Sequence, residues 1–322
     1  MTFISRRALL AAPALLAAPA FAQGAWSPTR AIRLIAPYSP GGGVDTTARL
    51  LAGPMGAALG QPVAVDNRAG AGGSLGAAEL ARSAPDGHTI MVDAMAHTVN
   101  PALLRNLPFN YATAFTPISQ VVVLPQIMIV PLSAPARNLQ EYVGHLRGQQ
   151  GAPYGSSGNA TAAHLAGALL CQRAELRMEH VPYRGGTAAI PDVIAGNLAF
   201  AFGTVSSSLQ LVRDGRVKAL GVTTAQRIAS LPDVPTIAEQ GFPGFELNEW
   251  NGLYAPAGLP EAATARIYQA MQAALADTAV KARLEALGAM PLGTPPAEFA
   301  RYVTEQRAAM AQLVQEAGIE AG

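Results

Sequence analysis

Two loops of small residues carry the polar groups of this chain that could bind a ligand. The first is PGGGVD at 40–45, which follows the apolar segment 32–36 and precedes a segment of helical spacing. The second is GSSGNA at 155–160, which follows Tyr154 and leads into a helical segment that opens at Thr161. Glycines let the backbone turn sharply and leave the first amides of the next helix uncovered, which favours anions. The two loops therefore predict a site for phosphate or carboxylate.

A dinucleotide site is one alternative use of the glycines. Gly70, Gly72 and Gly76 give GxGxxxG after a predicted strand, and Asp93 ends the next predicted strand, where a ribose-binding acid is expected. However, DNRA at 66–69 separates the strand from the first glycine, and no acid–base pair for hydride transfer is evident. This alternative would make the chain an exported oxidoreductase with a nucleotide cofactor.

A serine hydrolase is a second alternative, prompted by GSSG and by the later His164. A nucleophile elbow needs GxSxG, whereas Gly155 and Gly158 are one residue too close together. His164 lies on the helix after the loop, where a histidine more often packs or caps than acts as a base. The spacing therefore argues against catalysis.

A binding protein that grips an organic anion is the third possibility. Each hydrogen bond to a carboxylate contributes roughly 1.5–3 kcal/mol, so a few donors on each loop could supply the roughly 8 kcal/mol of micromolar binding. Asp45 is interpreted as a helix cap, because an acid facing the anion would repel it. Tyr38 could pack on the sheet edge or form a wall of the pocket. His97 and Asn100, in AMAHTVNP, could instead shape a loop.

The cysteine and histidine residues do not indicate a metal site or a cofactor site. Cys171 is the only cysteine, so no thiolate cluster can form, and we interpret it as a small apolar residue on a helix. The histidines show no close ligand pair; they are His88, His97, His145, His164 and His180. We expect neither a metal nor a cofactor.

The first 22 residues have the composition of an export signal. Arg6 and Arg7 precede an apolar core at 8–18, and AFA at 20–22 is a small-x-small cleavage site. The paired arginines leave the twin-arginine and the general export routes open. No later segment is expected to span a membrane, since Pro125 interrupts the most apolar run. Charged residues make up 13% of the chain, and the net charge of +1 gives no indication of nucleic-acid binding.

Short apolar runs alternate with helical segments along the chain. Strands are predicted at 32–36, 63–66, 89–93, 121–124, 127–130, 178–181, 198–202 and 219–223, with another ending at Tyr154. Helices are predicted at 46–58, 74–83, 139–147, 161–172, 188–195, 261–276, 278–287 and 296–317. The alternation predicts an α/β fold with mostly parallel, doubly wound sheets. The length favours two of them, and the helices after 260 are expected to cover one lobe only.

The two strand–loop–helix units predict two lobes that face one another, because ligands bind beyond the carboxyl ends of the strands in open α/β sheets. Chain crossings are expected near 117–124 and 245–254. One lobe would therefore consist of residues 25–120 plus 250–322, and the other of residues 121–249. Two facing lobes that close on a ligand by a hinge motion are a Venus-flytrap architecture.

Several long motifs, in one order, make the chain resemble the Bug family, the extracytoplasmic receptors of tripartite tricarboxylate transporters. They are RLIAPYSPGGGVDTTARLLA, VDNRAGAGGSLGAAELARSAPDGHTIMV, YGSSGNATAAHLAG, HVPYRGGTAAIPDVIAGNLAFAF and GRVKALGVTTAQRIASLPDVPTIAEQG. The resemblance implies a periplasmic, non-enzymatic receptor that captures a small carboxylate and delivers it to a membrane permease. We expect this receptor to be a monomer.

Candidate ligand-binding residues follow from the loops and from the matching motifs. They are Tyr38, Gly42, Gly43, Ala71, Gly72, His97, Ser156, Ser157, Asn159, Thr161, His164, Tyr183 and Thr204. In one place the chain departs from many relatives, which have an aspartate at the end of the FAF strand. Here Gly203 and Thr204 leave no acid to pair with a ligand amine. The resemblance therefore implies a carboxylate without an amino group.

Overall fold

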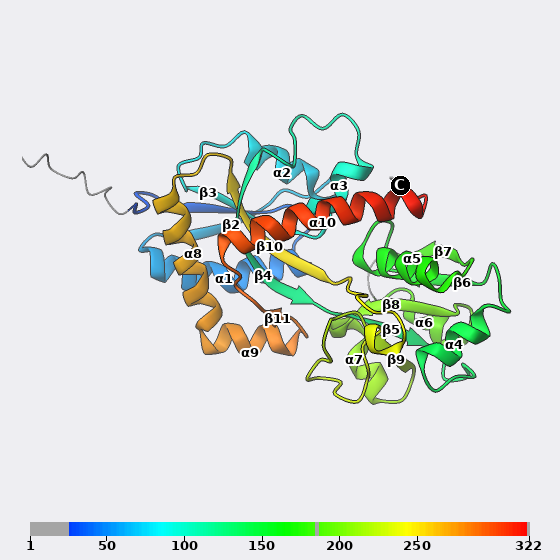
Figure 1. The fold of residues 1–322 in the computed structure, drawn as a ribbon. Coiled ribbons are helices and arrows are strands. Elements are labelled where there is room, and N and C mark those ends of the chain that lie inside the picture. Colours follow the sequence, from blue (N-terminus) through cyan, green and yellow to red (C-terminus); the bar gives the residue numbers. More distant parts are fainter. Residues whose placement is uncertain (1–25, 184–186, 321–322) are drawn as a thin grey trace, which may run out of the picture.

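The computed structural model describes residues 26–183 and 187–320. The predicted export signal, at 1–22, lies outside the described residues. Two β-sheets, each flanked by helices, lie side by side, with the long helix α10 (Pro296–Glu316) running from one towards the other (Figure 1). Among the described residues, no helix combines the length and the apolar character needed to cross a membrane.

The first sheet has six strands in the order β11-β4-β10-β3-β1-β2. The strands are β1 (Ile32–Ala36), β2 (Val63–Asn67), β3 (Thr89–Ala94), β4 (Phe115–Leu124), β10 (Glu249–Pro256) and β11 (Met290–Pro291). β1 pairs in parallel with β2 and β3, whereas β10 is antiparallel to both β3 and β4. Alternate residues of β1 enter different cores, Leu34 on the α1 side and Ile35 on the α10 side, so both faces of the sheet are covered.

The second sheet repeats this plan with five strands in the order β7-β6-β8-β5-β9. The strands are β5 (Gln126–Val130), β6 (Pro153–Ser156), β7 (Glu179–Pro182), β8 (Phe200–Thr204) and β9 (Lys218–Val222). β6 is parallel to β7 and β8, and β5 is antiparallel to β8 and β9. In each sheet the reversed strand, β10 or β5, follows directly after the chain has crossed from the other sheet. The sheets are therefore mixed rather than purely parallel.

Helices cover both sheets. Those that follow strands of the first sheet are α1 (Gly43–Leu59), α2 (Ser74–Ala81), α3 (Ala96–Leu103), α8 (Glu261–Ala276), α9 (Thr278–Ala286) and α10. Those of the second are α4 (Leu139–Leu146), α5 (Ala162–Ala174), α6 (Ile190–Ala195) and α7 (Val205–Arg213). α1 buries Val44, Ala48, Leu51 and Met55, whose spacing of three and four residues forms one face, and it packs on α8.

The two crossings between the sheets are hydrogen-bonded to one another. One runs from the end of β4 through Pro125 into β5, and the other runs from β9 to β10. Thr223 joins them, because its Oγ1 accepts from the Gln126 N–H at 3.0 Å and donates to Asn248 Oδ1 at 2.7 Å. Both crossings are thereby held together at one place, as expected for a hinge.

Several features differ from the sequence prediction, among them the strand β10, which was not predicted. The lobe boundaries predicted at 121 and 249 fall inside β4 and β10, because the segment 121–124 pairs with β10 in the first sheet. The segment around His97 is the helix α3 rather than a loop. α10 does not cover one lobe only: it packs on α3 and β4 and also reaches α5 of the second sheet (Figure 1).

Candidate functional site

The triple glycine forms the entry to α1. Gly42 is the N-cap residue of this helix, and no described side chain caps it. Asp45 accepts hydrogen bonds from the Gly41 N–H at 2.8 Å, from Asn67 and from Arg49. Burial disfavours its charge, but these hydrogen bonds outweigh that effect and lower the pKa of Asp45 to about 2. Asp45 therefore fixes the loop as the third residue of α1, rather than as its predicted N-cap residue, while Gly42 and Gly43 stay exposed.

The second turn of the first lobe, residues 70–73, has four successive residues with positive φ, of which Ala71 is the only one that is not glycine. Ala71 and Gly72 are exposed. Asn100 of α3 holds this turn, since its Nδ2 donates to the Gly72 carbonyl at 2.9 Å. The turn is thus fixed in a conformation that most residues avoid, with its amides near the surface.

Tyr38 and His97 meet at Asp93, the acid near the end of β3. The Tyr38 hydroxyl donates to Asp93 Oδ1 at 3.1 Å, and His97 Nδ1 lies 3.0 Å from Oδ2. His97 is 1% exposed and stacks on Tyr254, with 4.0 Å between the ring centres. Burial lowers the pKa of His97, and Asp93 opposes this shift. His97 is therefore buried behind Tyr38 and fixes Asp93 from inside the protein.

Hydrogen bonds from the hydroxyl groups of Ser156 and Ser157 fix the conformation of the second-lobe loop. Ser156, at the end of β6, is fully buried, and its Oγ lies 2.9 Å from the Gly158 carbonyl and 2.7 Å from His180 Nε2. A hydroxyl has one proton, so donation to Gly158 leaves His180 as the donor to Ser156. Thr161 caps α5 and accepts from Ser157 at 3.1 Å. Ser156 thus shapes the loop, while Ser157 and Thr161 stay partly exposed.

His164 and His180 form a stacked pair beneath this loop. Their ring centres lie 3.5 Å apart, with 6° between the planes. His164 Nδ1 accepts from the Ala160 N–H at 3.0 Å, which places its proton on Nε2. Burial, together with the neighbouring ring, lowers the pKa of His164 to about 3, and burial lowers that of His180 to about 4. Both rings are neutral at physiological pH, and His164 is 5% exposed.

Thr204 and Tyr183 extend this edge of the second sheet. Thr204 is the N-cap residue of α7, which it does not cap through its side chain, and its Oγ1 lies 3.0 Å from Ser206 Oγ. The Tyr183 hydroxyl donates to Asp192 at 2.6 Å, so it is turned towards α6. Thr204 is partly exposed beside the crossing strand β5, where it is opposite Gln126.

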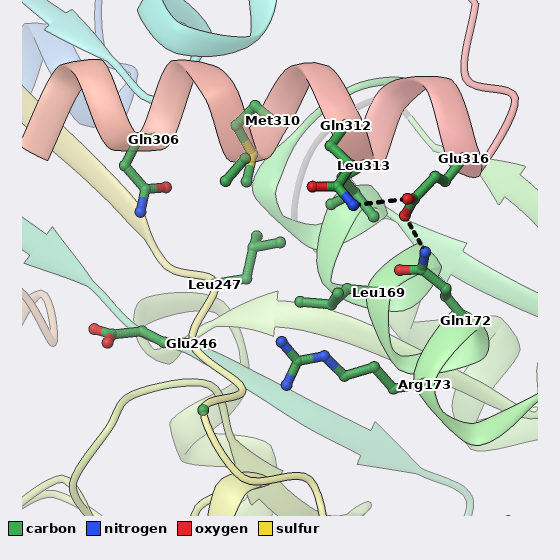
Figure 2. A pocket seen from close by; sticks show the side chains of 12 residues that line it. Leu169, Gln172, Arg173, Glu246, Leu247, Gln306, Met310, Gln312, Leu313 and Glu316 are labelled. Carbon is green, nitrogen blue, oxygen red and sulfur yellow. Dashed lines mark hydrogen bonds between the residues drawn. The ribbon is translucent and has the colours of Figure 1, made fainter.

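Asn159 is engaged by the C-terminal segment, because its Nδ2 donates to the Glu320 carbonyl at 2.6 Å. Glu316 of α10 is also bonded to Gln172 of α5. Between these helices lies a cavity of about 390 Å³, to which the 244–247 crossing contributes. Figure 2 shows Leu169 and Leu247 facing Met310 and Leu313 of α10, with polar side chains around these four. This cavity lies apart from the predicted loops.

The structure thus groups the candidate residues in two sets. In the first sheet, Tyr38, Gly42, Gly43, Ala71, Gly72 and His97 lie on the segments that follow β1, β2 and β3. In the second sheet, Ser156, Ser157, Asn159, Thr161, His164, Tyr183 and Thr204 lie at the ends of β6, β7 and β8 or just after them. No hydrogen bond among the described residues links one set directly to the other. Asp93, Asn100 and His180, which hold these loops, were not among the predicted site residues.

Neither enzymatic alternative fits this geometry. Asp93, the acid that would bind a ribose, is 1% exposed and is already bonded to Tyr38 and to the Ala94 N–H. Ser156 is fully buried, and the histidine that it meets is His180 rather than His164.

Sequence comparison identifies the family. The model of the tripartite tricarboxylate transporter family receptor matches residues 47–319. A protein encoded in the tcbD-tcbE intergenic region of a Pseudomonas species is 36% identical over 291 residues, which cover 90% of this chain and 87% of that protein. Protein BugT of Bordetella pertussis is 29% identical over 294 residues, covering 90% of each chain.

Solved structures agree with this assignment. The periplasmic binding protein BugD superposes with a TM-score of 0.74 at 32% identity, over 91% of this chain and 99% of its own. MatC of Rhodopseudomonas palustris, with bound malate, superposes with a TM-score of 0.73 at 30% identity, over 89% of this chain and 99% of its own. R. palustris Rpa4515, with adipate, superposes with a TM-score of 0.77 at 29% identity, over 91% of this chain and 99% of its own. The predicted binding-protein fold is confirmed, and the chain belongs to the Bug-type tripartite tricarboxylate transporter receptors, which are solute-binding proteins and not enzymes.

Proposed function

We propose that this receptor captures a small organic carboxylate between its two sheets and delivers it to the permease of a tripartite tricarboxylate transporter. The lobes would be residues 26–124 plus 249–320 and residues 125–248, with the paired crossings at Thr223 as the hinge. After removal of residues 1–22, the receptor would act in the periplasm as a monomer.

The observation that carries this proposal is the pair of helix starts without a side-chain cap, at Gly42 and Thr204. Each lies at the end of a strand, one in each sheet, which is where ligands of open α/β sheets bind. Backbone amides and the positive end of a helix dipole favour an anion. Ser157 and Thr161 add hydroxyls to the second set. The dicarboxylates held by MatC and Rpa4515 fit this chemistry.

The ligand is proposed to lack an amino group. Gly203 and Thr204 end β8, so no acid stands at that position to pair with an ammonium group. Calorimetry should therefore show weaker binding of aspartate or glutamate than of succinate, malate or adipate. Tighter binding of the amino acids would contradict this part of the proposal.

A thermal-shift screen against mono-, di- and tricarboxylates tests the function itself. A ligand at one hundred times its Kd adds about 2.7 kcal/mol to the free energy of unfolding, which should raise the Tm by roughly 5–10 °C. No stabilisation by any carboxylate would refute the proposal. Vesicle uptake with the cognate permease, with and without the receptor, tests delivery.

A substitution in the second-lobe loop tests the position of the site. Ser157→Leu puts a large side chain at a partly exposed position of the loop and should abolish the ligand-induced shift. Ser133→Leu is the matched control, since Ser133 is exposed on a turn of the same lobe. A full shift in Ser157→Leu would show that this loop is not part of the site.

A further inference from the structure

An acid that the sequence analysis did not single out, Glu249, lies at the edge of the first sheet that carries the binding loops. It is the first residue of β10, which is antiparallel to β3 and β4. Its end of β10 therefore lies beside the C-terminal ends of those strands: Glu249 is opposite Leu124, and Asn251 is opposite Ala94. Because ligands bind beyond these strand ends, Glu249 shares an edge with the proposed carboxylate site.

Backbone groups hold one oxygen of the Glu249 carboxyl. Its Oε1 accepts from the N–H groups of Met95 and Trp250, each at 3.0 Å. Met95 lies between the end of β3 and the start of α3, so the carboxyl is fixed against the strand end. The side chain is partly exposed. The ion pairs formed within residues 26–183 and 187–320 do not include Glu249.

The nearby acid on β3 makes the surroundings of Glu249 unfavourable for a second negative charge. Burial, and in addition the charge of Asp93, raise the pKa of Glu249 to about 7, although the two backbone hydrogen bonds oppose this. The other titratable groups in this region are Tyr38 before α1, Tyr302 and Arg307 on α10, and His97 on α3. Arg307 donates to the Tyr111 carbonyl rather than to Glu249.

We propose that capture of a carboxylate at this edge is coupled to the uptake of one proton by Glu249, which makes Glu249 a specificity-determining residue. The inference rests on the proposed function. An entering anion adds negative charge beside Glu249, and the Glu249 carboxyl takes up a proton from solvent. Since Oε1 accepts two N–H groups, the proton binds to Oε2, where it removes the repulsion and supplies an O–H donor.

Calorimetry with adipate and with malate, in two buffers of different ionisation enthalpy at pH 7.5, measures the protons taken up. Both ligands are fully ionised there, because aliphatic carboxyls titrate near 4. The wild type should take up about half a proton or more per ligand, and its affinity should fall by up to about tenfold for each pH unit above about 7. Glu249→Gln keeps the acceptor for Met95 and Trp250, and should bind without proton uptake and with little pH dependence.

Glu305→Gln is the matched control, because it removes one carboxylate at an exposed position of α10 and should behave like the wild type. Proton uptake that is absent in the wild type, or equal in the wild type and Glu249→Gln, overturns the inference. Affinity that rises with pH in the wild type and is lost in Glu249→Gln also overturns it, since Glu249 would then bind a cationic group. Binding without coupling leaves the proposed function standing, whereas failure to bind any carboxylate at pH 6 refutes both.

A measurement without ligand checks the titration itself. An acid whose pKa is raised in the folded state keeps its proton between about 4.5 and 7, where the unfolded chain has lost it. Its contribution to the free energy of unfolding is therefore full below about 4.5 and declines as the pH rises to about 7. The two buried histidines act in the opposite direction in both proteins, so the free energy of unfolding of the wild type minus that of Glu249→Gln, from urea titrations, should show this decline. Identical pH profiles of the two proteins would overturn the inference.

Discussion

Gly73→Ala should disturb the first-lobe loop far more than an ordinary substitution of a glycine with positive φ. Gly73 has a φ of +90°, and a Cβ added there would lie 2.8 Å from Tyr38 Oη and 3.0 Å from Tyr38 Cζ. Gly60, which ends α1, has a φ of +74° and nothing within 4 Å of an added Cβ. The two positions therefore share the backbone strain but differ in the contact with Tyr38.

The expected losses can be compared directly. A left-handed conformation costs a residue with a Cβ about 1–2 kcal/mol, and this should be the whole effect of Gly60→Ala. At Gly73 the added carbon must also displace the Tyr38 hydroxyl from Asp93, and a hydrogen bond to a charged group contributes about 1.5–3 kcal/mol. Gly73→Ala should therefore lower the free energy of unfolding by about 3–5 kcal/mol.

Urea denaturation followed by circular dichroism measures both losses, and Tyr38→Phe completes a double-mutant cycle. Removing the hydroxyl removes the atom closest to the added carbon, so Gly73→Ala should cost less in the Tyr38→Phe background. Equal losses for Gly73→Ala and Gly60→Ala, or strict additivity in the cycle, would refute the idea that Tyr38 and Gly73 form one packed unit.

Three further outcomes are expected. Because His164 and His180 have lowered pKa values in the folded state, about 3 and about 4, their contribution to the free energy of unfolding should be full above pH 6.5 and decline below it. The free energy of unfolding of the wild type minus that of His180→Gln, from urea titrations, should therefore fall as the pH is lowered below 6.5, and a difference that does not change with pH would contradict the assignment. Gly288→Ala would bring a Cβ to 2.4 Å from Val205 Cγ1, so its Tm should fall by roughly 3–10 °C, with Val205→Ala restoring part of the loss. Cys171 should react slowly with iodoacetamide at pH 8, since burial raises its pKa to about 12; labelling as fast as in the unfolded chain would contradict this.

The strands that sequence could predict are those whose pattern is local. The segment 32–36 is an apolar run bounded by turn residues, and β1 has the predicted limits. β10 was not predicted, because Glu249, Asn251 and Gly252 interrupt its apolar residues. The polar groups of this central strand have partners far away in the chain: Asn251 accepts from Thr47 of α1 at 2.8 Å, and Glu249 accepts from Met95. A pattern along one segment cannot show such partners.

The same limit applies to the site. The glycines at 41–43 and the serines at 156–157 could be identified as loops because small residues before a helix are a local pattern. The groups that hold these loops are remote in sequence, as in the bond between Asn100 and the Gly72 carbonyl or between His180 and Ser156. For His97 the sequence left ligand contact and the shaping of a loop as alternatives. Its burial within α3 comes from tertiary packing.

In the proposed site, the acids of the first lobe would have two opposing roles towards an anion. Asp45 accepts from the Gly41 N–H and Asn67, and Asp93 accepts from Tyr38 and the Ala94 N–H, so each fixes the backbone that presents donors to the ligand. Each also adds negative charge near the anion. On the proposed function, the affinity would be a difference between fixed amide donors and this repulsion, and a group that can become neutral, as inferred for Glu249, would shift that difference most readily near neutral pH.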